Sequence, residues 1–89
     1  MIRHTITIIN KLGLHARAAA KLVKTSSEFE SQIQIRKDDR EVDGKSIMSV
    51  MMLAASRGTD IELIIDGPDE QAALDALTAL IDDYFGEGE

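Results

Sequence analysis

The alternation of apolar and polar residues predicts four β-strands and three α-helices. β-Branched residues at every second position, or in short runs, indicate strands over Arg3–Ile9, Gln32–Lys37, Arg40–Asp43 and Asp60–Ile65. Apolar residues three and four positions apart, among good helix formers, indicate helices over Ala16–Glu28, Ser46–Ala55 and Asp69–Tyr84. The predicted order is therefore βαββαβα.

This order predicts an α+β fold in which a four-stranded sheet carries its helices on one face. No repeat or linker interrupts the pattern, so we expect one domain over residues 1–89, with a frayed tail at Gly86–Glu89. The core-facing stripe predicted for the first helix comprises Ala19, Leu22 and Val23. That of the last helix comprises Ala73, Leu77, Leu80 and Tyr84.

The middle helix is apolar nearly all round. Val50 and Leu53 share one side of it, and the other side is formed by Ile47, Met48, Met51 and Ala55. A two-layer domain of this size cannot bury both sides. Because methionine is flexible and polarisable, the side left open suits an adaptable docking surface.

Composition narrows the class of protein. The 89 residues are 44% hydrophobic and only 3% aromatic, which fits a small aliphatic core. The chain has no cysteine, no signal peptide and no apolar run of the ~20 residues that span a bilayer. We therefore expect a cytoplasmic protein that does not insert into membranes.

Charge is distributed unevenly along the chain. The formal net charge is −6, yet the first 27 residues hold five basic residues and no acidic one. A basic end on an acidic protein favours acidic protein partners and phosphate over nucleic acid.

The segment from Asn10 to Arg17 carries the chemistry. It joins a strand to a helix, with Gly13 permitting backbone angles that larger residues resist, and it sets His15 at the start of the helix. Helix N-termini favour anions, and imidazole is a competent nucleophile at neutral pH. With the Arg17 guanidinium nearby, this arrangement suits phosphoryl transfer through a phosphohistidine. Taken alone, such a histidine and arginine are more often ordinary surface residues.

The second histidine does not indicate a metal site. His4 and His15 are eleven residues apart with no placed third ligand, so His4 is interpreted as an exposed strand residue. We expect neither a metal nor a cofactor.

Two segments resemble signatures of the HPr family, the histidine phosphocarriers of the bacterial phosphoenolpyruvate:sugar phosphotransferase system. Gly13-Leu14-His15-Ala16-Arg17-Ala18-Ala19 is similar to the active-site signature Gly-Leu-His-Ala-Arg-Pro-Ala. Gly44-Lys45-Ser46-Ile47-Met48-Ser49-Val50-Met51 is similar to the signature around a regulatory serine. The two occur in order and at the family's separation. Ala18 replaces a proline that would preset φ, which leaves the start of the helix less constrained.

The resemblance implies an open-faced sandwich with an antiparallel sheet in the order 1-4-2-3. It implies that His15 carries a phosphoryl group on Nδ1, received from phosphorylated Enzyme I and passed to EIIA-type domains. Arg17 and the backbone N–H groups of Ala16 and Arg17 would hold the phosphoryl oxygens. The protein would be a monomeric phosphocarrier and not an enzyme.

The resemblance also assigns the two sides of the middle helix. Val50 and Leu53 would face the core, and the residues docking partners would be Ile47, Met48, Met51, Lys24 and Lys45. Ser46 is expected to cap this helix through its hydroxyl. Because Lys45-Ser46-Ile47-Met48 is similar to the regulated version of the family, an HPr kinase/phosphorylase would phosphorylate Ser46.

Two other interpretations stay open. One is an HPr paralogue that signals nitrogen or carbon status without sugar transport. The other is a small regulatory ligand-binding domain of similar βαβ architecture. A ligand sensor needs no nucleophile, so His15 together with Arg17 favours the phosphocarrier.

Overall fold

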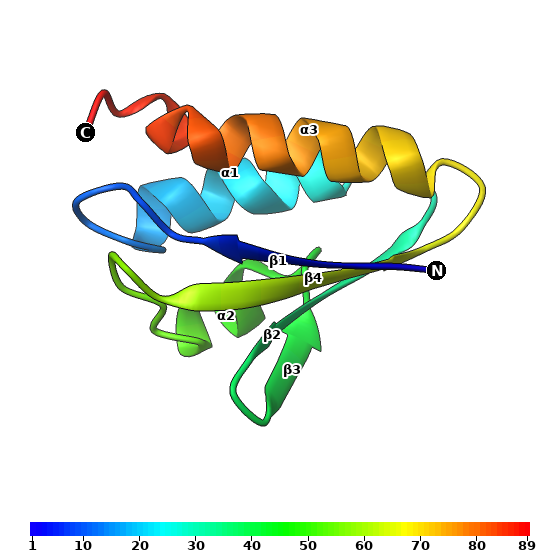
Figure 1. Cartoon of the computed structure of the whole chain (residues 1–89), viewed down its shortest axis with the longest axis horizontal. Helices are drawn as coiled ribbons and strands as arrows, with labels where there is room; N and C mark the ends of the chain where they lie inside the picture. Colours follow the sequence, from blue (N-terminus) through cyan, green and yellow to red (C-terminus); the bar gives the residue numbers. More distant parts are fainter.

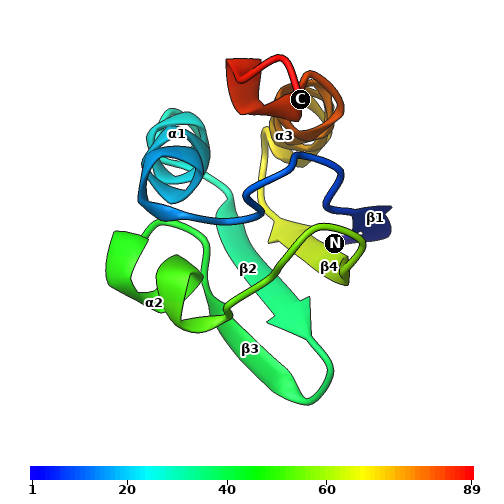
Figure 2. The same cartoon turned by 90° about the vertical axis from the view of Figure 1, so that its left-hand side faces the viewer.

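The chain folds into four strands, three α-helices and a short 3₁₀ helix, and the computed structural model describes residues 1–89. The elements are β1 (Ile2–Thr7), α1 (Ala16–Ser26), β2 (Gln32–Lys37), β3 (Arg40–Asp43), α2 (Ile47–Met52), β4 (Asp60–Asp66), α3 (Glu70–Asp82) and η1 (Tyr84–Gly86). The strands form one antiparallel sheet in the order β1-β4-β2-β3. The three helices lie on one side of this sheet (Figures 1 and 2). The predicted open-faced sandwich, including its strand order, is confirmed.

The core lies between the sheet and the helices, and its register follows the strand alternation. Ile33 and Ile35 of β2 pair with Ile65 and Leu63 of β4. Because side chains alternate across a sheet, these four residues share the face covered by the helices, and each is at most 1% exposed. The helices complete the core with Leu22 of α1, Val50 of α2 and Leu77 of α3. No helix is long and apolar enough to cross a membrane.

The middle helix α2 is shorter than predicted, ending at Met52 instead of Ala55. Ala54 has a φ of 51°, a left-handed conformation that breaks the helix. Two basic side chains of the β2–β3 hairpin donate to carbonyl groups at this end of the helix. Arg40 Nη1 donates to the Met52 oxygen at 2.8 Å, and Lys37 Nζ donates to the Leu53 oxygen at 3.1 Å. Ala55, which helical periodicity groups with Ile47, Met48 and Met51, therefore lies beyond the helix and is only 2% exposed.

The end of α3 also differs from the prediction. The helix stops at Asp82, and Ile81 takes the buried position expected for Tyr84, which is 38% exposed. Tyr84 and Phe85 both adopt left-handed backbone angles, with φ values of 56° and 54°. The tail that follows lies at the same end of the molecule as the start of α1 (Figure 1).

Candidate functional site

Asn10 and Gly13 fix the shape of the loop between β1 and α1. Gly13 has a φ of 65°, and a Cβ there would lie 2.5 Å from the backbone oxygen of Ala55. Glycine alone fits both this conformation and this close approach, which confirms the role predicted for it. Asn10 is fully buried, and its Nδ2 donates to the Gly13 carbonyl at 2.8 Å. The residues that follow are therefore presented in one position.

His15 is the N-cap residue of α1. Its backbone is extended, and its side chain makes no capping hydrogen bond. The preceding residue, Leu14, is 5% exposed, and its N–H donates to the Ala55 oxygen at 2.8 Å. These contacts anchor the chain directly before His15. The N–H groups of Ala16 and Arg17 have no partner within the helix and receive none from the cap. The imidazole thus stands at the positive end of a helix.

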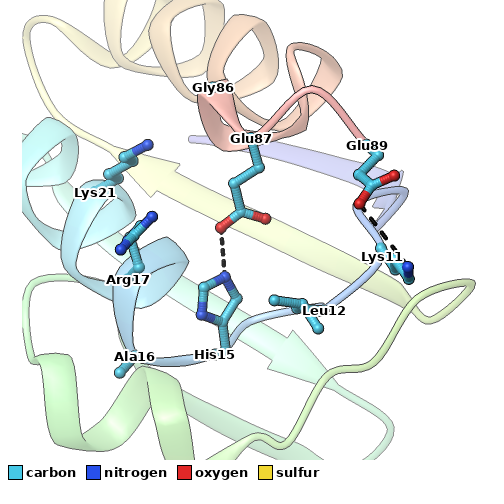
Figure 3. Close-up of a pocket in the computed structure, with 9 residues that line it drawn as sticks. All are labelled: Lys11, Leu12, His15, Ala16, Arg17, Lys21, Gly86, Glu87 and Glu89. Carbon is cyan, nitrogen blue, oxygen red and sulfur yellow. Dashed lines mark hydrogen bonds and ion pairs between the residues drawn. The ribbon is translucent and has the colours of Figure 1, made fainter.

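An open hollow of about 640 Å³ lies at the start of α1 (Figure 3). It is lined by Lys11, Leu12, His15, Ala16, Arg17, Lys21, Gly86, Glu87 and Glu89. Arg17 is exposed, and its guanidinium pairs with no carboxylate of the chain. A guanidinium without a partner in such a hollow is available to an incoming anion.

The C-terminal tail is not frayed, contrary to the prediction. Phe85 is fully buried, and Lys21 Nζ of α1 donates to its carbonyl oxygen at 2.5 Å. The Lys11 N–H donates to the Glu89 carbonyl at 3.0 Å, which ties the tail to the β1–α1 loop. One apolar anchor and two hydrogen bonds therefore hold the tail over the site. Two carboxylates of the tail accordingly join what the sequence suggested was a purely basic end.

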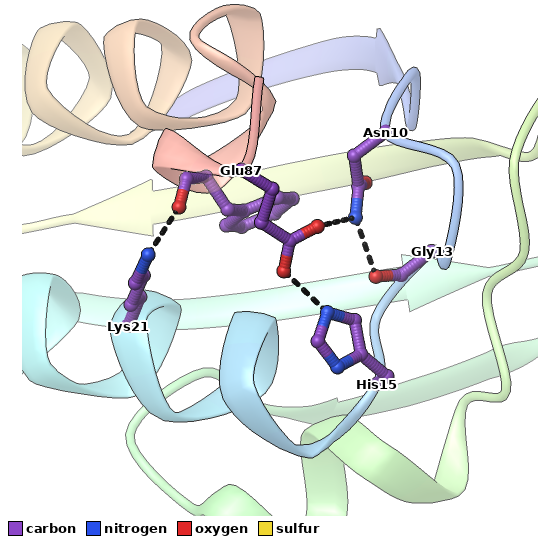
Figure 4. Close-up of polar contacts among 6 residues, drawn as sticks. Asn10, Gly13, His15, Lys21 and Glu87 are labelled. Atoms are coloured by element: carbon purple, nitrogen blue, oxygen red, sulfur yellow. Dashed lines mark hydrogen bonds and ion pairs between the residues drawn. The ribbon is translucent and has the colours of Figure 1, made fainter. Parts of the chain in front are cut away.

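Glu87 contacts the catalytic candidate directly. One carboxylate oxygen is hydrogen-bonded to His15 Nε2, and the other accepts from Asn10 Nδ2 at 3.0 Å (Figure 4). The Glu87 side chain is 12% exposed and that of His15 is 28% exposed. Burial raises the pKa of the Glu87 carboxyl, but the hydrogen bonds from Asn10 and His15 outweigh it and hold this pKa below its usual value. The carboxylate is therefore ionised at neutral pH.

The two ring nitrogens of His15 face different surroundings. Nε2 points toward Glu87, whereas the other nitrogen, Nδ1, lies on the side of the ring toward the start of α1 (Figure 3). A nucleophile on that side would act beside the free N–H groups of Ala16 and Arg17. Such an arrangement can bind the oxygens of a tetrahedral or trigonal phosphoryl group while its phosphorus is attacked.

The residues around the second signature lie on and before α2. Ser46 is the N-cap of α2, and its Oγ accepts from the Ser49 N–H at 3.4 Å, so the predicted capping role is confirmed. Lys45 is only half-exposed, and its Nζ donates to the Phe29 carbonyl at 2.7 Å. That ammonium group is engaged within the protein, unlike the guanidinium of Arg17.

The two sides of α2 are distinct. Val50 is fully buried and Leu53 is 2% exposed, whereas Met48 is 67% exposed. Ile47 and Met51 are 40% and 39% exposed. Figure 2 shows α2 beside the end of α1 that begins next to His15. The helix that carries these exposed residues therefore lies beside the helix that begins next to His15.

Two features of this region depart from the sequence-based expectation. Met52 is 64% exposed and extends the open apolar side of α2, although it was not predicted as part of it. Lys24 is exposed but lies in the last turn of α1, at the opposite end of that helix from His15. The structure thus separates Lys24 from the other basic residues of the site.

Sequence reasoning missed Asn10 and Glu87 as parts of the site. Asn10 was interpreted only as a turn residue, and Glu87 as part of a mobile end. The available signal was Phe85, an aromatic residue near the terminus of a chain with 3% aromatic content. A large apolar side chain in that context indicates a buried anchor, and hence an ordered tail.

Comparison with known proteins agrees with the geometry. The family model for the PTS HPr component phosphorylation site matches residues 2–83. The phosphocarrier protein HPr of Neisseria meningitidis serogroup A is 58% identical over 89 residues, covering all of both chains. A crystal structure of HPr from Thermoanaerobacter tengcongensis superposes with a TM-score of 0.95 at 49% identity, covering 98% of each chain. A crystal structure of an HPr dimer from the same organism gives a TM-score of 0.79 at 49% identity, covering 98% of this chain and 100% of that one.

The resemblance found in the two signatures therefore extends over the whole fold. Full-length identity of 58% and a TM-score of 0.95 leave the small ligand-binding domain without support. The protein is a phosphocarrier and not itself an enzyme. The chain belongs to the HPr family, the phosphocarrier proteins of the phosphotransferase system.

Proposed function

We propose that His15 accepts a phosphoryl group from phosphorylated Enzyme I and passes it to EIIA-type domains. The observation that carries this proposal is the position of the imidazole at the N-terminus of α1, beside the unpaired guanidinium of Arg17. Positive backbone groups and a bidentate cation on one side of a nucleophile favour the charge distribution of phosphoryl transfer. Little else is required, because this chemistry depends mainly on position and electrostatics.

The transfer step is a displacement at phosphorus. The Nδ1 lone pair of His15 forms the new N–P bond while the N–P bond to the donor histidine of Enzyme I breaks. The donor imidazole leaves with that bonding pair. Free N–H groups of Ala16 and Arg17, with the Arg17 guanidinium, would bind the phosphoryl oxygens as their charge shifts. Onward transfer to an EIIA histidine repeats the step in the opposite sense.

Phosphorylation by a purified Enzyme I tests the proposal. The protein is incubated with phosphoenolpyruvate and Enzyme I, and its intact mass is measured before and after brief acid treatment. We expect a gain of one phosphoryl group that acid removes, because phosphohistidine is acid-labile and phosphoserine is not. No mass gain, or a gain that survives acid, would contradict a phosphohistidine carrier.

The open side of α2 supports a docking role for Ile47, Met48 and Met51, which we propose bind both Enzyme I and EIIA-type domains. These side chains are exposed on the helix that lies beside the start of α1, and Met52 continues the same surface. Lys45 would favour acidic partners from the edge of this surface, although it first has to leave the Phe29 carbonyl. Lys24, exposed in the last turn of α1, would add positive charge further from His15. We propose that the carrier acts as a cytoplasmic monomer, since it has to meet two different partners through one surface.

Ser46 supports a regulatory proposal, in which an HPr kinase/phosphorylase modifies its hydroxyl. The residue is half-exposed at the N-terminus of α2, directly before the open side of that helix. Phosphate there adds about −1.5 to −2 charges next to the surface that docks partners. Negative charge at a helix N-terminus does not disrupt the fold, so the effect is expected in partner affinity.

Replacement of Ser46 by aspartate is expected to slow phosphorylation by Enzyme I while changing stability by less than about 1 kcal/mol. The added charge repels an acidic partner, and the deficit is expected to shrink as salt screens this repulsion. Initial transfer rates at low and high salt measure it. Ser46→Asn is the matched control, because asparagine also caps a helix but carries no charge. Equal rates for both variants at low salt would reduce Ser46 to a helix cap.

A further inference from the structure

The Glu87 carboxylate connects the C-terminal tail to both the nucleophile and the loop that positions it. One of its oxygens meets His15 Nε2, and the other accepts from Asn10 Nδ2 at 3.0 Å. The same Asn10 nitrogen donates its second hydrogen to the Gly13 carbonyl at 2.8 Å. Figure 4 shows this chain of contacts from the tail to the β1–α1 loop.

The direction of each hydrogen bond is fixed by its partners. Both neighbours of the Asn10 amide are acceptors, a carbonyl and a carboxylate, so its NH₂ group and not its oxygen faces them. An ionised carboxylate only accepts, so the contact with His15 requires a hydrogen on Nε2. In a neutral imidazole, a hydrogen on Nε2 leaves the lone pair on Nδ1.

We propose that Glu87 is a positioning residue for phosphoryl transfer, which holds His15 in the Nε2–H tautomer and so makes Nδ1 the nucleophile. This inference rests on the proposed role of His15 as phosphoryl acceptor. Two contacts hold Glu87 in this position: the Phe85 side chain is buried in the core, and Lys21 donates a hydrogen bond to the Phe85 carbonyl. A carboxylate that orients a histidine in this manner is a recurring arrangement in catalytic and metal sites.

The arrangement also accounts for the charge that develops on the ring. When the Nδ1–P bond forms and the donor N–P bond breaks, the proton on Nε2 remains in place and the imidazole becomes cationic. The Glu87 carboxylate stabilises this cation at short range. When the phosphoryl group moves on, the Nδ1–P bond breaks and the ring returns to the neutral Nε2–H form. No proton has to enter or leave the site in either direction.

Replacement of Glu87 by glutamine tests the inference, because the variant is expected to reverse the tautomer. The amide oxygen of glutamine has to face the Asn10 NH₂ group, which leaves its own NH₂ toward His15 Nε2. That nitrogen must then accept, so the hydrogen moves to Nδ1. The matched control is Glu41→Gln, which removes the same charge from an exposed side chain on β3 that does not line the hollow.

Two readouts are taken on each protein. The ¹⁵N shifts of the His15 ring, recorded at about pH 8.5, identify the tautomer. Single-turnover phosphorylation by Enzyme I gives the maximal rate and the concentration dependence separately. We expect Nε2–H in the wild type and in Glu41→Gln, and Nδ1–H in Glu87→Gln. The maximal rate of Glu87→Gln is expected to fall by about 10- to 100-fold with little change in half-saturation, and that of Glu41→Gln by less than about twofold.

The outcomes separate this inference from the proposed function. A wild-type Nδ1–H tautomer, or a Glu87→Gln tautomer like that of the wild type, overturns the inference. So does a reversed tautomer with an unchanged maximal rate. If the wild type gains no phosphoryl group at all, the proposed function fails and the role in transfer fails with it. In that case, the ring shifts still report whether Glu87 sets the tautomer.

Discussion

Replacement of His15 by alanine is expected to abolish acid-labile phosphorylation by Enzyme I and to leave the fold intact. No other nucleophile stands at the start of α1, so nothing replaces the imidazole. The side chain is 28% exposed and contributes no core packing. Its loss removes one hydrogen bond to the Glu87 carboxylate, worth about 1.5–3 kcal/mol, against a typical total stability of about 5–15 kcal/mol.

The second histidine provides the control for this experiment. His4 is exposed on β1, opposite Leu63 of β4, and is not among the residues lining the hollow. His4→Ala is therefore expected to accept the phosphoryl group at the wild-type rate. Intact mass of each variant after incubation with phosphoenolpyruvate and Enzyme I makes the comparison, and urea unfolding reports stability. Retained acid-labile phosphorylation in His15→Ala would remove this residue from the mechanism.

Arg17 is expected to affect the rate of transfer without being essential for it. Glutamate at this position places a like charge beside the phosphoryl oxygens, and we expect Arg17→Glu to slow phosphorylation by about 100-fold. Acceptance persists, because the backbone N–H groups remain. An acidic residue in a first helical turn is compatible with the helix dipole, so unfolding is not the cause of the slower rate. Arg17→Lys keeps the charge but loses the bidentate fork, and an intermediate rate is expected from the same single-turnover assay.

The parts of the structure that followed from the sequence are those encoded locally. Ile33 and Ile35 alternate with polar residues, and this alternation alone places them on the inner face of β2. Gly13 was identified because a strand and a helix had to be joined within a few residues. The position of His15 at the helix start followed from the same turn. In each case, neighbours within one or two turns of the chain decide the outcome.

The parts that did not follow depend on residues distant in sequence. Helix α2 ends at Met52 because Arg40 and Lys37, which are 12 and 16 residues from their acceptors, satisfy its last carbonyls. Glu87 reaches His15 across 72 positions, and the buried Phe85 together with the hydrogen bonds from Lys21 and Lys11 holds the tail in place for that contact. No periodicity within the tail predicts such a contact. The composition of the tail is polar and glycine-rich, which by itself indicates fraying.

The two sides of α2 are expected to respond in opposite ways to a negative charge. Val50 is fully buried in the core, so Val50→Asp places a carboxylate where no partner exists. We expect this variant to lose about 4 kcal/mol or more of unfolding free energy, a large part of the stability of a small domain. Urea unfolding measures the loss.

Met48→Asp and Met51→Asp are the counterparts on the open side, with Met48 67% exposed. We expect Met48→Asp to change stability by less than about 0.5 kcal/mol, since a surface substitution near a helix N-terminus costs little. Affinity for Enzyme I and for EIIA-type domains is expected to fall by about tenfold or more, because a charge replaces an apolar contact in the docking surface. Titration calorimetry with each partner measures this directly.

Comparison of the buried and exposed substitutions decides whether α2 has two separate functions. If Met48→Asp binds weakly but unfolds like the wild type, while Val50→Asp unfolds readily, one side holds the fold and the other binds partners. Equal destabilisation of the two variants would mean that both sides are part of the core. The physical reason to expect the first result is area: α2 has only six residues, and a single sheet and one neighbouring helix cover one of its sides. The uncovered methionines are then left to pack against whichever protein brings its histidine to His15.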